Sequence, residues 1–181
     1  MPEEILIRQG APTLAGIKTG SLFPCPCEDR EALLSDIRQL NLSPMGLCLL
    51  PIRFLAGQAL LYLYRPAVLR RDLRDARASE LLRQAGYEDE SCARCVARLA
   101  YRFRESGEFP HEVGLFLSYP PEDVKGFIDH RANDFKYAGL WKVYGDEEKA
   151  RSLFTKYRKC TEIYCALWQS GSRLEQLAVA V

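Results

Sequence analysis

The sequence has almost no net charge, because its 25 lysine and arginine residues nearly balance its 24 aspartate and glutamate residues. A formal charge of +1 gives no general attraction to nucleic acid or to an anionic membrane, so we expect neither as a partner. Low charge also gives little colloidal repulsion, which makes a homodimer one expectation. The N-terminus lacks the basic and long apolar segments of a secretory signal, so we expect a cytoplasmic protein.

Long uninterrupted hydrophobic runs are also missing. Residues 45–64 are long enough to span a membrane and carry a single charge, but Pro51 and Gly57 interrupt them near the centre. Two strands, residues 45–53 and 58–65, explain the interruption more simply as an antiparallel hairpin.

The sequence contains no known catalytic or cofactor-binding motif. The phosphate-binding pattern G-x-x-x-x-G-K-[ST] is absent, and there are only two histidines, His111 and His130. The sequence therefore identifies no cofactor, and any site has to be argued from clusters of side chains.

Seven cysteines, an odd number without a signal peptide, are typical of reduced thiols in a cytosol. Zinc or iron–sulfur ligands are expected on turns, whereas Cys92 and Cys95 begin a helical run. Cys160 and Cys165 lie five residues apart in a predicted helix and point in different directions. We interpret the cysteines mainly as small buried side chains and predict no metal site.

A pattern in residues 109–127 recurs 25 residues later in the chain. The matching parts are Gly114–Phe116 with Gly139–Trp141, Tyr119 with Tyr144, and Glu122–Asp123 with Glu147–Glu148. Each copy predicts a short strand, a tyrosine at its exit, a turn, and a helix that begins with acidic residues.

The whole pattern predicts an α+β fold, or a mixed α/β layer, with about five strands, one hairpin among them, and about five helices packed on the sheet. Besides the hairpin, the sequence predicts a strand at 13–18 and helices at 28–39, 67–85, 92–105 and 146–169. No linker divides the chain, so we expect a single domain over residues 1–181. We expect residues 1–10 to be loose, and residues 172–181 to be loose or to form one helical turn.

The first candidate site is the segment around Lys18, Thr19 and Ser21, which also contains two glycines. A cation, hydroxyls and flexible backbone within a few residues can hold a phosphate or a carboxylate. The alternative is an ordinary glycine-containing strand and turn with a solvated lysine.

The second candidate site is the pair His111 and Glu112 at the entrance of the first repeated strand. A histidine there can act as a general base, and Cys25, just before a predicted helix, is a candidate nucleophile. The alternative function is therefore a cysteine-dependent hydrolase or transferase that uses Cys25 and His111.

The third candidate site is an aromatic and cationic set on the second repeat, formed by Asn133, Lys136, Tyr137, Trp141, Lys142 and Tyr144. Tyr119 of the first repeat is a further candidate ligand-binding residue. One strand face could stack a planar ligand while Lys142 contacts its charge. The alternative is that these aromatic side chains belong to the core.

Three segments, PTLAGIKTGSLF, FPHEVGLFLSYPPEDVKGFI and YAGLWKVYGDEEKARSLFTKYRKC, resemble a family of bacterial proteins known as domain of unknown function 3793. The resemblance covers most of the chain. It implies a stand-alone cytosolic protein and no established activity, substrate or cofactor.

We therefore expect a cytosolic protein that binds a small anionic or planar ligand between the Lys18 loop and the His111 strand. Two alternatives stay open, the thiol enzyme with Cys25 and His111 and a non-catalytic regulatory or protein-interaction module.

Overall fold

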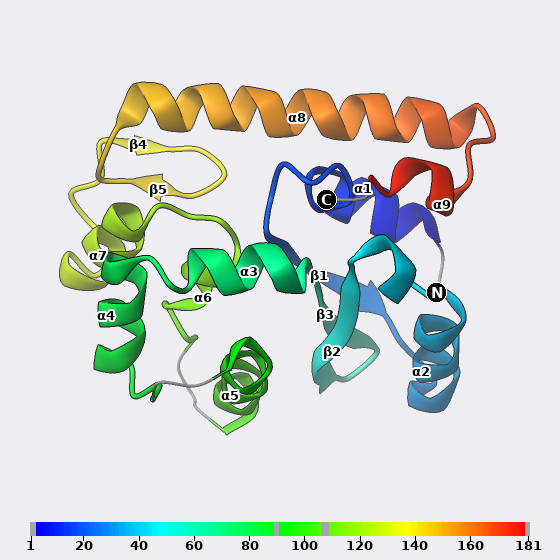
Figure 1. The fold of residues 1–181 in the computed structure, drawn as a ribbon, viewed down its shortest axis with the longest axis horizontal. Helices are drawn as coiled ribbons and strands as arrows, with labels where there is room; N and C mark the ends of the chain where they lie inside the picture. Colours follow the sequence, from blue (N-terminus) through cyan, green and yellow to red (C-terminus); the bar gives the residue numbers. More distant parts are fainter. Residues whose placement is uncertain (1–2, 89–90, 106–108, 180–181) are drawn as a thin grey trace. The chain divides into compact units, whose positions relative to one another are not determined.

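The computed structural model describes residues 3–88, 91–105 and 109–179 (Figure 1). Its contacts divide the chain into two compact units, unit 1 with residues 1–67 and 159–181, and unit 2 with residues 68–158. We describe each unit by itself, and the expectation of a single domain stays a prediction. Both units combine helices with antiparallel strands, which confirms the predicted α+β class.

Unit 1 is built on a three-stranded antiparallel sheet with the strand order β1-β3-β2. The predicted hairpin is confirmed, since β2 and β3 pair from Cys48 and Tyr64 down to Leu55 and Gln58. The elements of unit 1 are α1 (Glu3–Leu14), β1 (Gly20–Pro26), α2 (Arg30–Gln39), the 3-10 helix η1 (Ser43–Met45), β2 (Cys48–Leu55), β3 (Gln58–Tyr64), the C-terminal part of α8 (Glu147–Gln169) and α9 (Leu174–Leu177).

The core of unit 1 lies between α1 and the sheet. Helix α1 comes so close to β3 that a Cβ atom on Gly10 would lie 2.6 Å from Cδ2 of Leu63, and glycine permits this approach. The buried apolar side chains that fill this core include Leu6, Ile7, Leu14, Phe23, Leu61, Leu63, Leu174 and Leu177.

A buried arginine joins four segments of unit 1. Arg65, directly after β3, is only 1% exposed. Its guanidinium donates to the backbone carbonyls of Thr13 (2.7 Å), Leu14 (2.6 Å), Met45 (3.3 Å) and Val179 (2.6 Å). Thr13 and Leu14 are the last residues of α1, where the helix dipole favours a cation. Arg65 therefore ties the end of α1, η1 and the C-terminal segment to the sheet.

Unit 2 is mainly helical. Its elements are α3 (Pro66–Asp72), which begins in unit 1, α4 (Ala76–Gln84), α5 (Cys92–Glu105), α6 (Val113–Phe116), α7 (Pro121–Asp129), β4 (Tyr137–Ala138), β5 (Lys142–Val143) and the N-terminal part of α8. Strands β4 and β5 form a two-stranded antiparallel sheet. The predicted helices 92–105 and 146–169 are confirmed as α5 and α8.

The two copies of the repeat hold each other through a buried carboxylate. Asp123, in the first turn of α7, is 3% exposed. Its carboxylate accepts hydrogen bonds from the Trp141 indole (2.7 Å) and from the backbone N–H groups of Tyr144 (2.8 Å) and Gly145 (2.7 Å). Tyr119 of the first copy also stacks on Trp141 of the second, with ring centroids 4.7 Å apart. Hydrogen bonds and ring stacking thus join the two copies of the repeat inside unit 2.

The predicted strand of the first repeat is wrong. Residues 113–116 form the helical turn α6, and all four are buried. A short apolar run that is buried on every side lacks the polar alternation that distinguishes a strand from a helix. The helical halves of both copies are confirmed, with acidic residues in the first turns of α7 and α8.

Three other sequence predictions need correction. Residues 3–10 belong to α1, because this segment buries Leu6 and Ile7 in the core of unit 1. The strand expected at residues 13–18 begins only at Gly20, since α1 continues past Pro12 to Leu14. The helix expected over residues 67–85 is divided, because Asp75 caps a new helix, α4, by accepting from the Arg77 and Ala78 N–H groups.

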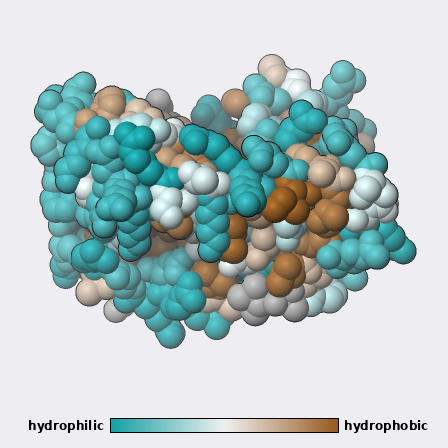
Figure 2. Space-filling view, turned by 90° about the horizontal axis from the view of Figure 1, so that it is seen from above, coloured by the Kyte–Doolittle hydropathy of each residue, from teal (hydrophilic) through white to brown (hydrophobic). Residues whose placement is uncertain are grey.

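The surface contains some exposed apolar side chains. Figure 2 shows such side chains on a face that is otherwise largely hydrophilic. On α8, Ile163 is 47% exposed and Leu167 is 40% exposed. In residues 3–88, 91–105 and 109–179, no helix has both the length and the apolar character that a membrane span requires.

Replacing Arg65 with methionine is expected to destabilise the protein by about 3–5 kcal/mol, because four inward-facing carbonyls would lose a charged donor. Arg65→Lys keeps the charge but has no planar fork of donors, so an intermediate loss is expected. Urea unfolding followed by circular dichroism measures both. Arg53→Met removes an exposed arginine of β2 and is the control. Equal unfolding midpoints for Arg65→Met and the control would show that the hydrogen bonds of Arg65 do not stabilise unit 1.

Replacing Asp123 with asparagine is expected to cost about 2–4 kcal/mol, because the amide can accept from some of the three donors but opposes another with its own N–H₂ group. The fluorescence of Trp141, isolated by Trp168→Phe, reports the unfolding of unit 2. Asp129→Asn, on an exposed position of the same helix, is the matched control. An unfolding transition equal to that of the control would show that the hydrogen bonds of Asp123 do not stabilise unit 2.

Candidate functional site

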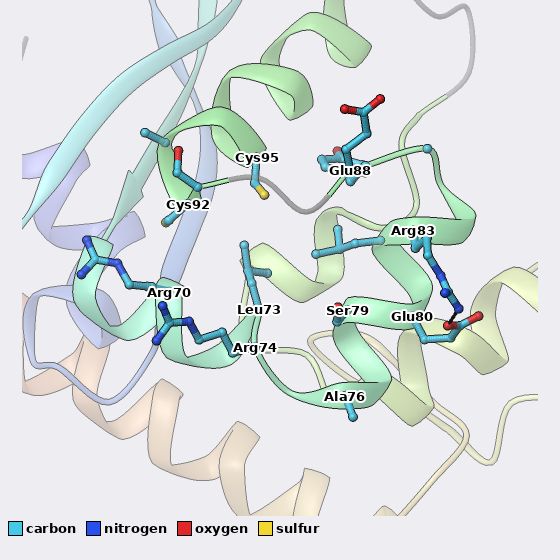
Figure 3. Close-up of a pocket in the computed structure, with 15 residues that line it drawn as sticks. Arg70, Leu73, Arg74, Ala76, Ser79, Glu80, Arg83, Glu88, Cys92 and Cys95 are labelled. Atoms are coloured by element: carbon cyan, nitrogen blue, oxygen red, sulfur yellow. Dashed lines mark hydrogen bonds and ion pairs between the residues drawn. The ribbon is translucent and has the colours of Figure 1, made fainter.

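A large open groove lies in unit 2 between the α3–α4 segment and the start of α5. Its volume is about 1270 Å³. Figure 3 shows Arg70 and Arg74 at one end, Glu80 and Arg83 at the other, and Leu73 between them, facing the start of α5. Another hollow, in unit 1, is smaller, with a volume of about 190 Å³.

Two local features give the groove its walls. Capping by Asp75 starts α4 in a new direction after α3 ends at Asp72. Gly86 then ends α4 with a φ of +84°, a left-handed conformation that glycine adopts without strain. Helix α5 places its apolar side, with Cys95, Val96 and Leu99, toward the interior of unit 2.

The groove is rich in arginine. Arg70 and Arg74 are exposed and make no ion pair with a residue that the structure describes, whereas Arg83 is paired with Glu80. Arg70 and Arg74 therefore give one end of the groove a positive charge.

A buried polar network supports the floor. Tyr87 lines the groove, is 3% exposed, and donates its hydroxyl to the Glu112 carboxylate at 3.0 Å. Arg102 pairs with the same carboxylate at 2.6 Å and donates to the Ala85 carbonyl at 3.0 Å. Burial and the neighbouring Glu112 raise the pKa of Tyr87, so its hydroxyl stays a protonated donor. This network fixes the turn after α4.

Two thiols lie opposite the apolar part of the groove. Cys92 is half-buried, Cys95 is buried, and both line the groove. Figure 3 shows Cys92 and Cys95 across from Leu73, with the Cys95 sulfur directed toward the groove. Within the described part of the chain, no group of three or more His, Cys, Asp and Glu residues could hold a metal ion.

The predicted anion segment of unit 1 is largely part of the interior. Thr19 is 2% exposed and Ser21 is 4% exposed, and the Ser21 hydroxyl lies 2.9 Å from that of Thr13. Lys18 is half-buried, and burial lowers its pKa to about 8. The packing of the two hydroxyls favours a structural role for them, and the ligand-binding role of this segment stays a prediction.

The structure corrects the surroundings expected for Cys25 and His111. Cys25 lies inside β1, is fully buried, and precedes the cap of α2 by four residues, so burial raises its pKa instead of a helix lowering it. His111 is exposed and precedes the helix α6, with its ring 5.0 Å from that of Phe127. Cys25 belongs to unit 1 and His111 to unit 2. Their catalytic roles stay predictions, and the burial of Cys25 does not favour a nucleophile.

The other predicted binding residues take part in contacts inside unit 2. Glu112 holds Tyr87 under the groove, and Trp141 is bound to Asp123. Lys142 donates to the Ala132 carbonyl at 2.7 Å. Tyr119 stacks on Trp141, while the Tyr144 ring stacks on His130 with centroids 5.6 Å apart. These contacts agree with the alternative that the aromatic set is structural.

The residues that line the groove were not among the predicted site residues. Arg70 and Arg74 occupy positions i and i+4 of the predicted helix 67–85, a spacing that places two cations on one side. In the structure, however, α3 ends at Asp72, so Arg74 lies in the turn that follows and helical spacing does not explain why both arginines line the groove. The turn that opens the groove was not predictable from helical periodicity, because the apolar residues continue across it.

Lys18→Met is expected to stabilise the protein by roughly 1–3 kcal/mol at neutral pH, because the folded state disfavours the charged amine. Below pH 8, Lys18 is charged in the folded and in the unfolded chain, so the full cost of burying the charge is present. From pH 8 to 10.5 the unfolded chain binds more protons than the folded protein. The stability of the wild type therefore rises with pH in this range, and the difference in stability between the variant and the wild type shrinks. Urea unfolding at several pH values measures this. Lys159→Met, at an exposed position, is the control. A pH-independent difference would disprove the desolvation of Lys18.

Comparison with known proteins gives one match. A family model described as "Protein of unknown function (DUF3793)" matches residues 6–178. No curated protein matches the chain, and no solved structure matches it. Because the family model spans nearly the whole length of both units, the chain belongs to the DUF3793 family.

Proposed function

We propose that this protein binds a small organic anion in the groove of unit 2. The observation that carries the proposal is the pair Arg70 and Arg74, exposed at one end of a groove of about 1270 Å³ and without an ion pair to any described residue. Guanidinium groups bind carboxylates and phosphates through two parallel hydrogen bonds. The proposal keeps the anionic ligand class predicted from the sequence and assigns it a different place.

The rest of the groove suits a ligand with an apolar or planar body. Leu73, Leu82 and the ring of Tyr87 form its apolar part. The guanidinium of Arg98 lies 5.8 Å from the centre of the Tyr87 ring, which adds positive charge close to the floor. Small-molecule sites typically combine such an apolar lining with a few polar groups that fix orientation.

The other functions predicted from the sequence are less well supported. Burial of Cys25 disfavours the thiolate that a cysteine hydrolase needs. A ligand near Lys18 and His111 stays a prediction, as do the cytoplasmic location and the homodimer. Exposed Ile163 and Leu167 on α8 agree with a protein-interaction module but do not indicate what would cover them.

Binding of citrate and of inorganic pyrophosphate, measured by isothermal titration calorimetry, tests the proposal. Arg70→Gln and Arg74→Gln are each expected to weaken binding about tenfold, because a charge-assisted hydrogen bond contributes roughly 1.5–3 kcal/mol. Affinity should also fall as the salt concentration rises.

Arg71→Gln is the matched control. Arg71 lies on α3 next to Arg70, is exposed and pairs with Asp72 instead of lining the groove. An equal loss of affinity in all three variants would indicate general charge attraction, and no binding by the wild type would refute the anion site for these two ligand classes.

A further inference from the structure

The two cysteines of the groove form a C-x-x-C pair at the start of a long helix. Helix α5 begins at Cys92 and has 14 residues, so Cys92 and Cys95 occupy positions i and i+3 of its first turn. Residues three apart on a helix are neighbours, with Cβ atoms about 5–6 Å apart. A disulfide bond requires Cβ atoms about 3.5–4.5 Å apart, so the first turn would have to tighten for the two sulfur atoms to join.

The start of a helix favours negative charge close to its first N–H groups. The first N–H groups of a helix have no partner within the helix and carry the positive end of its dipole. The Ser91 hydroxyl accepts from the Arg94 N–H at 3.4 Å, and the Ser91 carbonyl accepts from the Cys95 N–H at 3.0 Å, which anchors the turn. Arg70 and Arg74 line the same groove and add positive charge.

The two thiols differ in exposure in the way that thiol–disulfide exchange requires. Cys92 is half-buried and can meet a substrate in the groove. Cys95 is only 5% exposed and lies one helical turn further inside, in reach of Cys92 but shielded from solvent. The first would attack an external disulfide, and the second would resolve the resulting mixed disulfide.

We infer that Cys92 and Cys95 form a redox-active dithiol that exchanges with a small anionic disulfide bound in the groove. The Cys92 thiolate attacks one sulfur of the substrate, forming a mixed disulfide and releasing the first substrate thiol. The Cys95 thiolate then attacks the Cys92 sulfur and releases the second thiol. The protein loses two electrons and two protons, and the substrate disulfide gains both. The preference for an anionic substrate rests on the proposed anion site.

The other cysteines lack this combination. Cys25 is fully buried in β1, where burial raises its pKa. Cys160 and Cys165 are five residues apart on α8, so their side chains diverge. Cys48 lies on β2 and is half-buried, as Cys92 is. Among the described residues, the pair on α5 alone joins neighbouring thiols, a helix start and a positively charged groove.

Incubation of the fully reduced protein with glutathione disulfide under anaerobic conditions tests the inference. The wild type should lose two of its seven thiols, with a disulfide mapped by mass spectrometry to Cys92 and Cys95. Cys92→Ser should keep its thiols. Cys95→Ser should stop at a stable glutathionyl adduct on Cys92, because the thiol that would resolve the mixed disulfide is missing. Cys48→Ser is the control and should react as the wild type does.

A neutral probe, bis(2-hydroxyethyl) disulfide, separates this inference from the proposed function. Arg70→Gln with Arg74→Gln should slow oxidation by glutathione disulfide about tenfold and leave oxidation by the neutral disulfide unchanged. If the double variant reacted with glutathione disulfide as fast as the wild type does, the anion preference would be refuted and the dithiol activity would remain. The redox-active dithiol would be refuted if the wild type kept all seven thiols, or if Cys92→Ser also lost two thiols on incubation with glutathione disulfide.

Discussion

The charge of Arg65 has to be accommodated in an interior that offers it almost no water, and unit 1 is organised around this requirement. Burying a cation is costly unless oxygen atoms surround it. Here the oxygens are carbonyls from the end of α1, from Met45 in η1 and from Val179 near the C-terminus. Segments far apart in the sequence thus share one donor, and the Val179 N–H in turn donates to Leu14 at 3.0 Å. Any rearrangement of one segment would leave the guanidinium undersatisfied, so this group selects one arrangement of all of them.

Unit 2 buries negatively charged groups, which also need partners in the interior. The Asp123 carboxylate accepts from one side chain and two backbone N–H groups, and the Glu112 carboxylate is held by Tyr87 and Arg102. Each of these carboxylates connects elements that are distant in the sequence. The two copies of the repeat differ in secondary structure yet pack together, because Asp123 at the start of α7 in the first copy accepts hydrogen bonds from residues on both sides of β5 in the second.

The sequence was informative where periodicity and turn chemistry act locally. The hairpin of β2 and β3 and the bounds of α5 follow from a glycine turn and from helical spacing, and both are confirmed. The failures come from tertiary packing. Helix α1 continues through Pro12, a residue that normally marks a boundary, because Leu6, Ile7 and Leu14 are buried in the core of unit 1. Among the predicted site residues, those with the most distinctive chemistry, such as Trp141 and Glu112, have their polar atoms engaged in internal bonds that no local pattern reveals.

The polar groups that are bonded inside each unit differ from those that line the groove of unit 2. Asp123, Glu112 and Arg65 are each matched by partners inside their own unit, so their chemistry maintains the fold. Arg70 and Arg74 stabilise nothing comparable among the described residues, yet both stand at the same opening. The groove also exposes part of Cys92, whereas Cys95 is buried. The accessible cations and thiol, over a floor held by Tyr87 and Glu112, are the features that support the proposal of ligand binding in this groove.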